Sequence, residues 1–82
     1  MTKLEVLRIF AQFNGFLQPD SVRLKLRPVP DRRSFYSYLG RLKGQGLLER
    51  NPNFRRGHLS YRLAERGRTR IEYLRRQLQS PS

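Results

Sequence analysis

One stretch of the sequence, residues 31–50, constrains the fold most, because it carries a clear helical period between two termination signals. Its apolar residues fall at i, i+3, i+4 and i+7 and so share one helix face: Phe35, Tyr38, Leu39 and Leu42. Asp31 is suited to cap the N-terminus, and Gly46 is suited to the left-handed position that ends a helix. We therefore predict a helix over residues 31–45, with an apolar face for a core and a basic face for a polyanion.

The length and composition of the chain restrict the class of protein. With 82 residues, of which 37% are hydrophobic, the sequence predicts a single small domain. A chain of this size buries only about 60% of its unfolded surface, so a large enclosed catalytic pocket is not expected. The absence of Cys excludes disulfides and thiolate metal sites. The sequence contains neither an apolar run near the ~20 residues of a membrane span nor a signal-peptide pattern.

The charge of the chain indicates its partner. Lys and Arg total 18 against 6 Asp and Glu, which gives a formal net charge of +12. Only three of these cations are lysines, and Arg forms the forked hydrogen bonds that suit phosphates and guanine edges. Self-repulsion on this scale destabilises a compact fold, so a nucleic acid that neutralises the charge is the simplest explanation.

The N-terminal segment predicts a helix over residues 2–13. Thr2 and Glu5 have the spacing of a capping box, and Asn14 and Gly15 end the helix. The periodic apolar residues of this segment are expected in the core.

The segment between the first helix and residue 31 is less regular. Residues 16–17 are an apolar pair that fits one small strand or a packed turn, and residues 18–27 predict a second helix ended by Pro28. Three apolar residues of this helix alternate, which leaves a strand as the alternative: Val22, Leu24 and Leu26. We expect Arg23 to be exposed in either case, and Val29 to fill the junction with the helix that follows.

A β-hairpin is expected after the helix over residues 31–45. Residues 47–51 and 59–63 predict its two strands, and residues 51–58 form a basic tip between them.

The C-terminal segment predicts a last helix over residues 64–79, followed by a disordered tail at residues 80–82. Gly67 lies inside this helix, where intrinsic propensity makes it about 1 kcal/mol less favourable than Ala. Residues 1–79 are thus expected to form one domain.

Two strings in the second half of the chain, SFYSYLGRLKGQGLLER and LSYRLAERGRTRIEYL, are similar to PadR-like and MarR-like regulators of bacteria and archaea. The residues of the first string that match the recognition helix of these families are Tyr36, Leu39, Leu42, Gly46 and Leu47. The residues of the second string that match the wing and the last helix are Tyr61, Leu63, Gly67 and Arg68. Ala64 stands where these families usually have Thr. The resemblance implies a winged helix-turn-helix: an α+β, mostly helical fold with a three-helix core, a two-stranded wing hairpin and a C-terminal helix.

The resemblance also implies that helix 31–45 lies in the DNA major groove, with its N-terminal residues on base edges. The helix residues expected to bind DNA are Arg32, Arg33, Tyr36, Ser37, Arg41 and Lys43. The helix dipole disfavours the two cations at its start, Arg32 and Arg33, which favours an anionic partner there.

The wing, residues 51–58, is expected on the DNA backbone or in the minor groove. Its candidate DNA-binding residues are Arg55, Arg56 and His58. His58 is the only His and is expected on the surface rather than in a metal site. Phe54 is expected to pack under the wing, with insertion between bases as the alternative.

Catalysis is not indicated by the sequence. The six acids are scattered, and neither a nucleophile with its base nor a Gly-rich phosphate loop is present. We therefore expect no enzyme, metal, cofactor or small-molecule ligand. The apolar residues of the last helix either close the core or form a homodimer seam, and both interpretations stay open.

These observations predict a sequence-specific double-stranded DNA-binding protein, a transcriptional regulator that associates with the nucleoid in a prokaryotic cytoplasm. Two alternatives use the same basic surface. One is an architectural or ribosome-associated nucleic-acid binder without sequence preference, and the other is a winged-helix adaptor that binds proteins.

Overall fold

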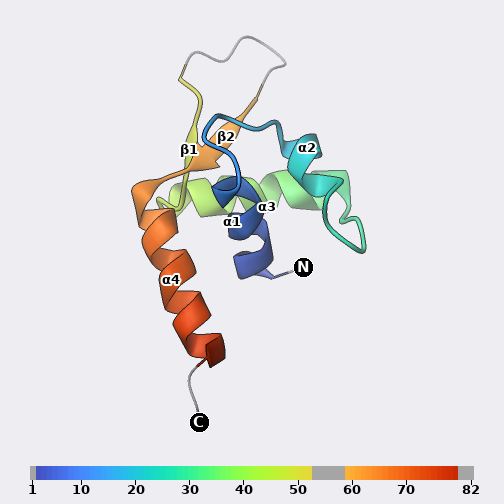
Figure 1. The fold of residues 1–82 in the computed structure, drawn as a ribbon. Coiled ribbons are helices and arrows are strands. Elements are labelled where there is room, and N and C mark those ends of the chain that lie inside the picture. Colours follow the sequence, from blue (N-terminus) through green and yellow to red (C-terminus); the bar gives the residue numbers. More distant parts are fainter. Residues whose placement is uncertain (1, 53–58, 80–82) are drawn as a thin grey trace.

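The computed structural model describes residues 2–52 and 59–79. Within them lie four helices and one two-stranded antiparallel sheet (Figure 1). The elements in chain order are α1 (Lys3–Ala11), α2 (Pro19–Arg23), α3 (Arg32–Gly44), β1 (Leu48–Arg50), β2 (Tyr61–Leu63) and α4 (Glu65–Gln79). The predicted α+β, mostly helical class is confirmed for this part of the chain.

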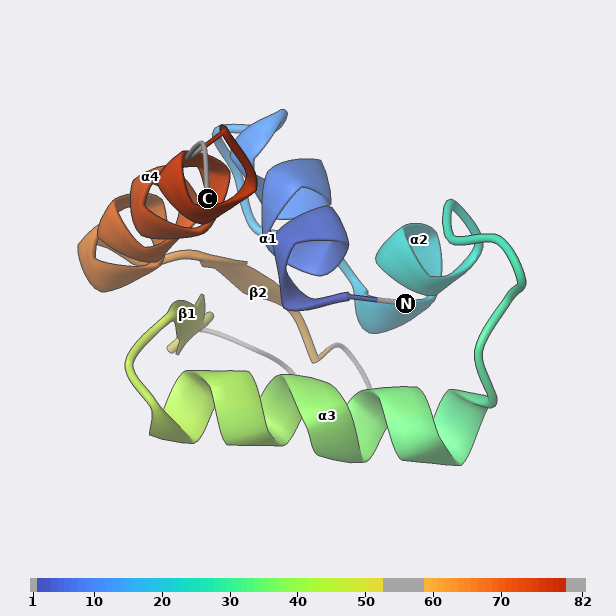
Figure 2. The same ribbon diagram turned by 90° about the horizontal axis from the view of Figure 1, so that it is seen from below.

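A single apolar core joins all of these elements. The residues predicted to be periodic supply most of it, and its largest fully buried side chains are Leu7, Phe10, Phe35, Leu39, Leu42 and Leu47. Figure 2 shows α3 along one side of the molecule, with α1, α2 and α4 together on its other side. The apolar face of α3 therefore points inward, and its opposite face borders solvent.

Both ends of α3 are fixed by the residues that the sequence singled out. The Asp31 carboxylate accepts a hydrogen bond from the backbone N–H of Ser34 at 3.0 Å. At the other end Gly46 has a φ of +79°, and the N–H of Leu47 donates to the carbonyl of Leu42 at 3.0 Å. This is a Schellman-type ending, which reverses the chain into β1.

The sheet is short and closely tied to the helices. Leu48 pairs with Leu63 and Glu49 with Arg62, and the latter pair also forms an ion pair at 2.7 Å. Leu17 forms an isolated antiparallel bridge to Tyr61, which favours the small strand over the packed turn as the interpretation of residues 16–17. Both strands are shorter than predicted.

The second helix predicted at residues 18–27 is present but shorter than predicted, and the expectation for Val29 is wrong. Helix α2 ends at Arg23, because the N–H groups of Lys25 and Leu26 bond to carbonyls three residues back, and Pro28 then disfavours further helix. The strand alternative is not observed there. Val29 is 42% exposed and so does not fill the junction.

The structure gives a reason for the glycine at position 67, which helix propensity alone disfavours. A Cβ at this position would collide with the carbonyl oxygen of Leu47 and would lie 2.6 Å from Cδ1 of Leu63. Glycine is therefore required by the close approach of α4 to the chain entering β1, and this steric cost outweighs the higher helix propensity of Ala.

We predict that Gly67→Ala lowers the free energy of unfolding by about 1–3 kcal/mol, because the added methyl group meets backbone that cannot move freely. Gly40→Ala is the matched control, since a Cβ there would meet nothing within 4 Å. It is expected to stabilise the protein by about 0.5–1 kcal/mol. Urea denaturation followed by circular dichroism measures both, and an equal change in the two variants would contradict the steric explanation.

Candidate nucleic-acid interface

The outward face of α3 presents a line of small residues behind one arginine. Successive helix residues are rotated by about 100°, which places four exposed residues farthest from the buried face: Arg33, Ser37, Gly40 and Gly44. We call this line the outer ridge. A Cβ at either glycine would meet nothing within 4 Å. The backbone of α3 is thus accessible over its second half.

The glycines of the outer ridge have no packing role in the fold. A glycine inside a helix is about 1 kcal/mol less favourable than Ala, and the open space around Gly40 gives no compensating contact. Sequence reasoning missed Gly40 and Gly44 as functional candidates. The signal that could have found them is the presence of two glycines within a stretch that is otherwise strongly helical.

Cationic residues flank the outer ridge on both sides. Arg41 lies on one flank, and Arg32 and Lys43 lie on the other. Tyr36 is on the same flank as Arg32 but is half-buried. Five of the six candidate residues predicted on this helix are therefore exposed, and Tyr36 is half-buried. Arg33, Ser37 and Arg41 face outward, whereas Arg32 and Lys43 lie closer to the buried face.

Arg32 differs from Arg33 in having partners within the chain. Its guanidinium lies 3.3 Å from Oδ2 of Asp20 and 5.5 Å from the centre of the Tyr36 ring. Hydrogen bonding to Tyr36, and then the Asp20 carboxylate, raise the pKa of Arg32 above its ordinary value. Asp20 thus compensates Arg32 within the chain, so the argument for an external anion at the helix start rests mainly on Arg33, and the roles of both residues stay predictions.

Asp20 also connects the two helices of the candidate interface. Its Oδ1 accepts a hydrogen bond from Nε of Arg23 at 3.0 Å, and Arg23 donates to the carbonyl of Pro30 at 3.1 Å. Arg23 is consequently half-buried, with its side chain 20% exposed, so the expectation that it is exposed is wrong. Sequence reasoning missed this network, whose only signal is an Asp and an Arg three residues apart at a helix start.

The expected hairpin tip lies outside the described residues. Arg55, Arg56, His58 and Phe54 all fall within residues 53–58, and their roles stay predictions.

No model of a known protein family matches the chain, and no curated protein matches it. Within residues 2–52 and 59–79, no three acidic or His side chains gather as ligands for a metal ion. In the same part of the chain, none of the helices has the length and apolar content to cross a bilayer.

The Asp31 cap at the start of α3 should stabilise the fold in a pH-dependent way. The hydrogen bond from the backbone of Ser34 lowers the pKa of Asp31 below its ordinary value of 3.8. The stabilisation is therefore present above that pH and is lost as the pH falls through the lowered pKa. We predict that Asp31→Ala lowers the melting temperature by a few degrees at pH 7, and that the difference from wild type disappears in acid.

Thr2→Ala is the control for this measurement. The Thr2 hydroxyl caps α1 by accepting from the N–H of Glu5 at 3.2 Å, and it does not titrate. Its effect should stay constant across the same pH series. A constant difference for Asp31→Ala as well would show that the carboxylate charge has no part in the cap.

Proposed function

We propose that this protein is a winged helix-turn-helix domain that binds double-stranded DNA in a sequence-specific manner and regulates transcription. In this proposal α3 enters the major groove, and the hairpin between β1 and β2 contacts the backbone or the minor groove. The observation that carries it is the outer ridge of α3, in which Arg33 precedes Ser37, Gly40 and Gly44. A prokaryotic, nucleoid-associated location follows from the same proposal.

The dimensions of α3 support this mode of binding. The major groove is about 12 Å wide and a helix with its side chains measures about 10–12 Å, so a helix enters deeply where its outer side chains are small. Gly40 and Gly44 would let the backbone of α3 approach the floor of the groove. Arg33, one turn before Ser37, would then reach a guanine edge with its forked guanidinium.

The charges around the outer ridge support contacts with the DNA backbone. Arg41 and Lys43 flank the ridge on opposite sides, as the two phosphate strands flank the major groove. Arg32 would contribute by exchanging Asp20 for a phosphate or a base, because its side chain remains 68% exposed in the ion pair. The net charge of +12 would add long-range attraction that weakens as salt increases.

The first test compares Arg33→Ala with Arg75→Ala, which removes the same charge from α4 on the other side of the molecule. A binding selection on random duplexes gives the preferred sequence, and fluorescence anisotropy gives the affinity for it and for a random duplex. Arg33→Ala should reduce the preference by about 1–3 kcal/mol, whereas Arg75→Ala should leave the preference unchanged.

Two results would replace this proposal by an alternative. If the selection yields no preferred sequence and both variants lose affinity equally, the protein is an architectural or ribosome-associated binder. If no nucleic acid binds at low salt, where phosphate contacts are strongest, the basic surface serves a protein partner.

The second test adds a large side chain to the outer ridge. Gly40→Leu points a side chain into open space, so the fold should be retained, but the side chain would hold α3 away from the groove floor. We expect the affinity for the preferred duplex to fall about tenfold or more. Gly15→Leu is the control, because Gly15 is also exposed with nothing within 4 Å but lies away from α3. Unchanged affinity in Gly40→Leu would exclude deep entry of α3.

A further inference from the structure

A groove lies between α1, α4 and the chain that follows α2. Its volume is about 800 Å³, and its apolar lining comes from Leu4, Ile9, Leu26, Leu74 and Leu78. Of these, Leu26 is buried, and Leu4, Ile9 and Leu74 are half-buried. Leu78 follows Leu74 by four residues on the same face of α4 and is 76% exposed. The apolar stripe of α4 thus continues past the end of the core into this α1–α4 groove.

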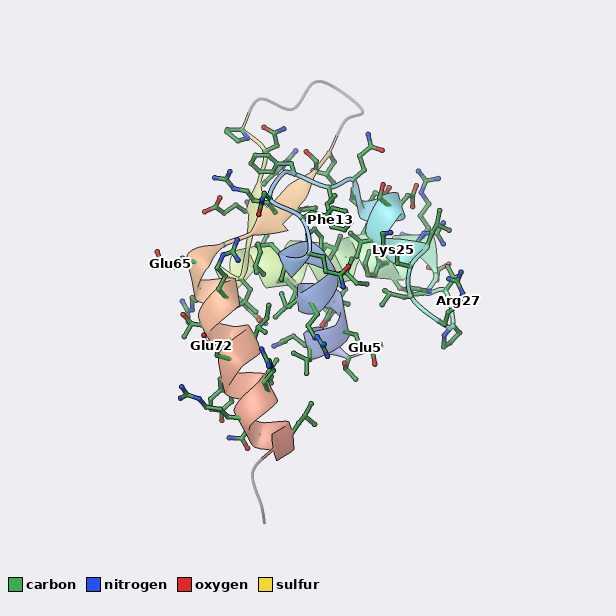
Figure 3. The ribbon with its side chains drawn as sticks, in the orientation of Figure 1. Glu5, Phe13, Lys25, Arg27, Glu65 and Glu72 are labelled. Atoms are coloured by element: carbon green, nitrogen blue, oxygen red, sulfur yellow. The ribbon has the colours of Figure 1, made fainter. Side chains whose placement is uncertain are left out.

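Cations dominate the rim of the α1–α4 groove. Lys3, Arg8, Lys25 and Arg27 line it, against the single acid Glu5. Figure 3 shows Lys25 and Arg27 on the chain after α2, and it shows Glu65 and Glu72 on the side of α4 away from α1. The acids of α4 therefore do not compensate the rim.

The rim cations have no carboxylate partner among the described residues. The carboxylates of Asp20 and Glu49 pair with other arginines, namely Arg23, Arg32 and Arg62. Arg27 donates instead to the carbonyls of Leu24 and Leu26, at 2.6 and 2.8 Å, which holds its charge beside the apolar lining. Lys3 lies 3.4 Å from the amide oxygen of Gln45, a neutral partner. An apolar floor with an uncompensated positive rim fits an apolar partner that carries negative charge on its flanks.

Charge complementarity separates the candidate occupants. A second copy of this chain would bring α4, with Arg75 and Arg76, against the cations of the rim, and each copy carries a net charge of +12. A flat lipid surface does not reach the floor of a concave groove between two helices. An amphipathic helix with apolar residues at i, i+3 or i+4 and i+7 and acids on its flanks satisfies both the floor and the rim.

We propose that the α1–α4 groove is the docking site for an acidic amphipathic helix of a partner protein. The partner's apolar face packs against Leu74 and Leu78 of α4 and Leu4 of α1. Its carboxylates face Arg8 and Arg27. Because this site lies on α1 and α4, whereas the outer ridge lies on α3, the proposal stands independently of DNA binding.

The experiment uses a fluorescent peptide of about 15 residues with leucines on one helical face and glutamates elsewhere, titrated with the whole protein. Two control peptides have the same length. One replaces every glutamate by lysine, and the other permutes the sequence so that no apolar face remains. Binding of the first peptide, with at least tenfold weaker binding of both controls, is the expected result.

Paired variants test whether the peptide binds in the α1–α4 groove. Leu78→Asp places a charge in the groove, and Leu24→Asp places the same charge at a leucine that is 55% exposed outside it. Arg8→Glu reverses a rim charge, and Arg75→Glu reverses a charge of α4 that does not line the groove. The first member of each pair should weaken peptide binding about tenfold, and the second should change it little. All four variants alter exposed side chains, and circular dichroism checks that each remains folded.

Several results would overturn the proposal. Equal binding of the permuted peptide, or equal loss within each pair, would mean that the peptide recognises only net charge. A protein that sediments as a dimer, and becomes monomeric in Leu78→Asp, would assign the groove to a second copy. Binding to vesicles rich in anionic lipid that Leu78→Asp removes, without peptide binding, would assign it to a membrane. Duplex binding measured in Leu78→Asp tests the DNA proposal separately.

Discussion

The structure depends on the burial of one face of α3. Phe35, Leu39 and Leu42 are at most 1% exposed, and each contributes about 1.5–3 kcal/mol by leaving water. In a chain with a net charge of +12, this apolar anchoring must also offset repulsion among the cations. Because the inward face of α3 is fixed, the rotation of the helix about its axis is fixed too. The outer ridge faces solvent for that reason.

A second, polar connection sets where α3 begins relative to α2. Asp20 holds Arg23 and Arg32 through its two oxygens, and Arg23 in turn holds the carbonyl of Pro30. The network occupies one arginine of the candidate interface in the free protein, whereas Arg33 has no such partner in the described part of the chain. The two neighbouring arginines are therefore chemically distinct, although they are adjacent in the sequence.

The fold separates two surfaces of different character. The outer ridge of α3 is convex, carries small side chains after Arg33 and is flanked by cations. This shape and charge suit the groove of a polyanion. The α1–α4 groove is concave, with leucines in its floor and cations at its rim, which suits a partner that is apolar as well as acidic. The two surfaces belong to different elements, since α3 lies on one side of the molecule and α1 and α4 lie on the other (Figure 2).

The sequence by itself determined the elements and the ends of the main helix. The apolar period places the core face of α3, and Asp31 and Gly46 limit it, because capping and the left-handed conformation depend on a few adjacent residues. The six interface candidates on α3 come instead from the resemblance to winged-helix regulators, and they stay predictions. The tertiary structure decided what depends on residues far apart in the chain. It makes Gly67 obligatory through the carbonyl of Leu47, pairs Arg32 with Asp20, and leaves Val29 exposed. It also assembles the α1–α4 groove, because a surface built from three separate segments has no period or motif in the sequence.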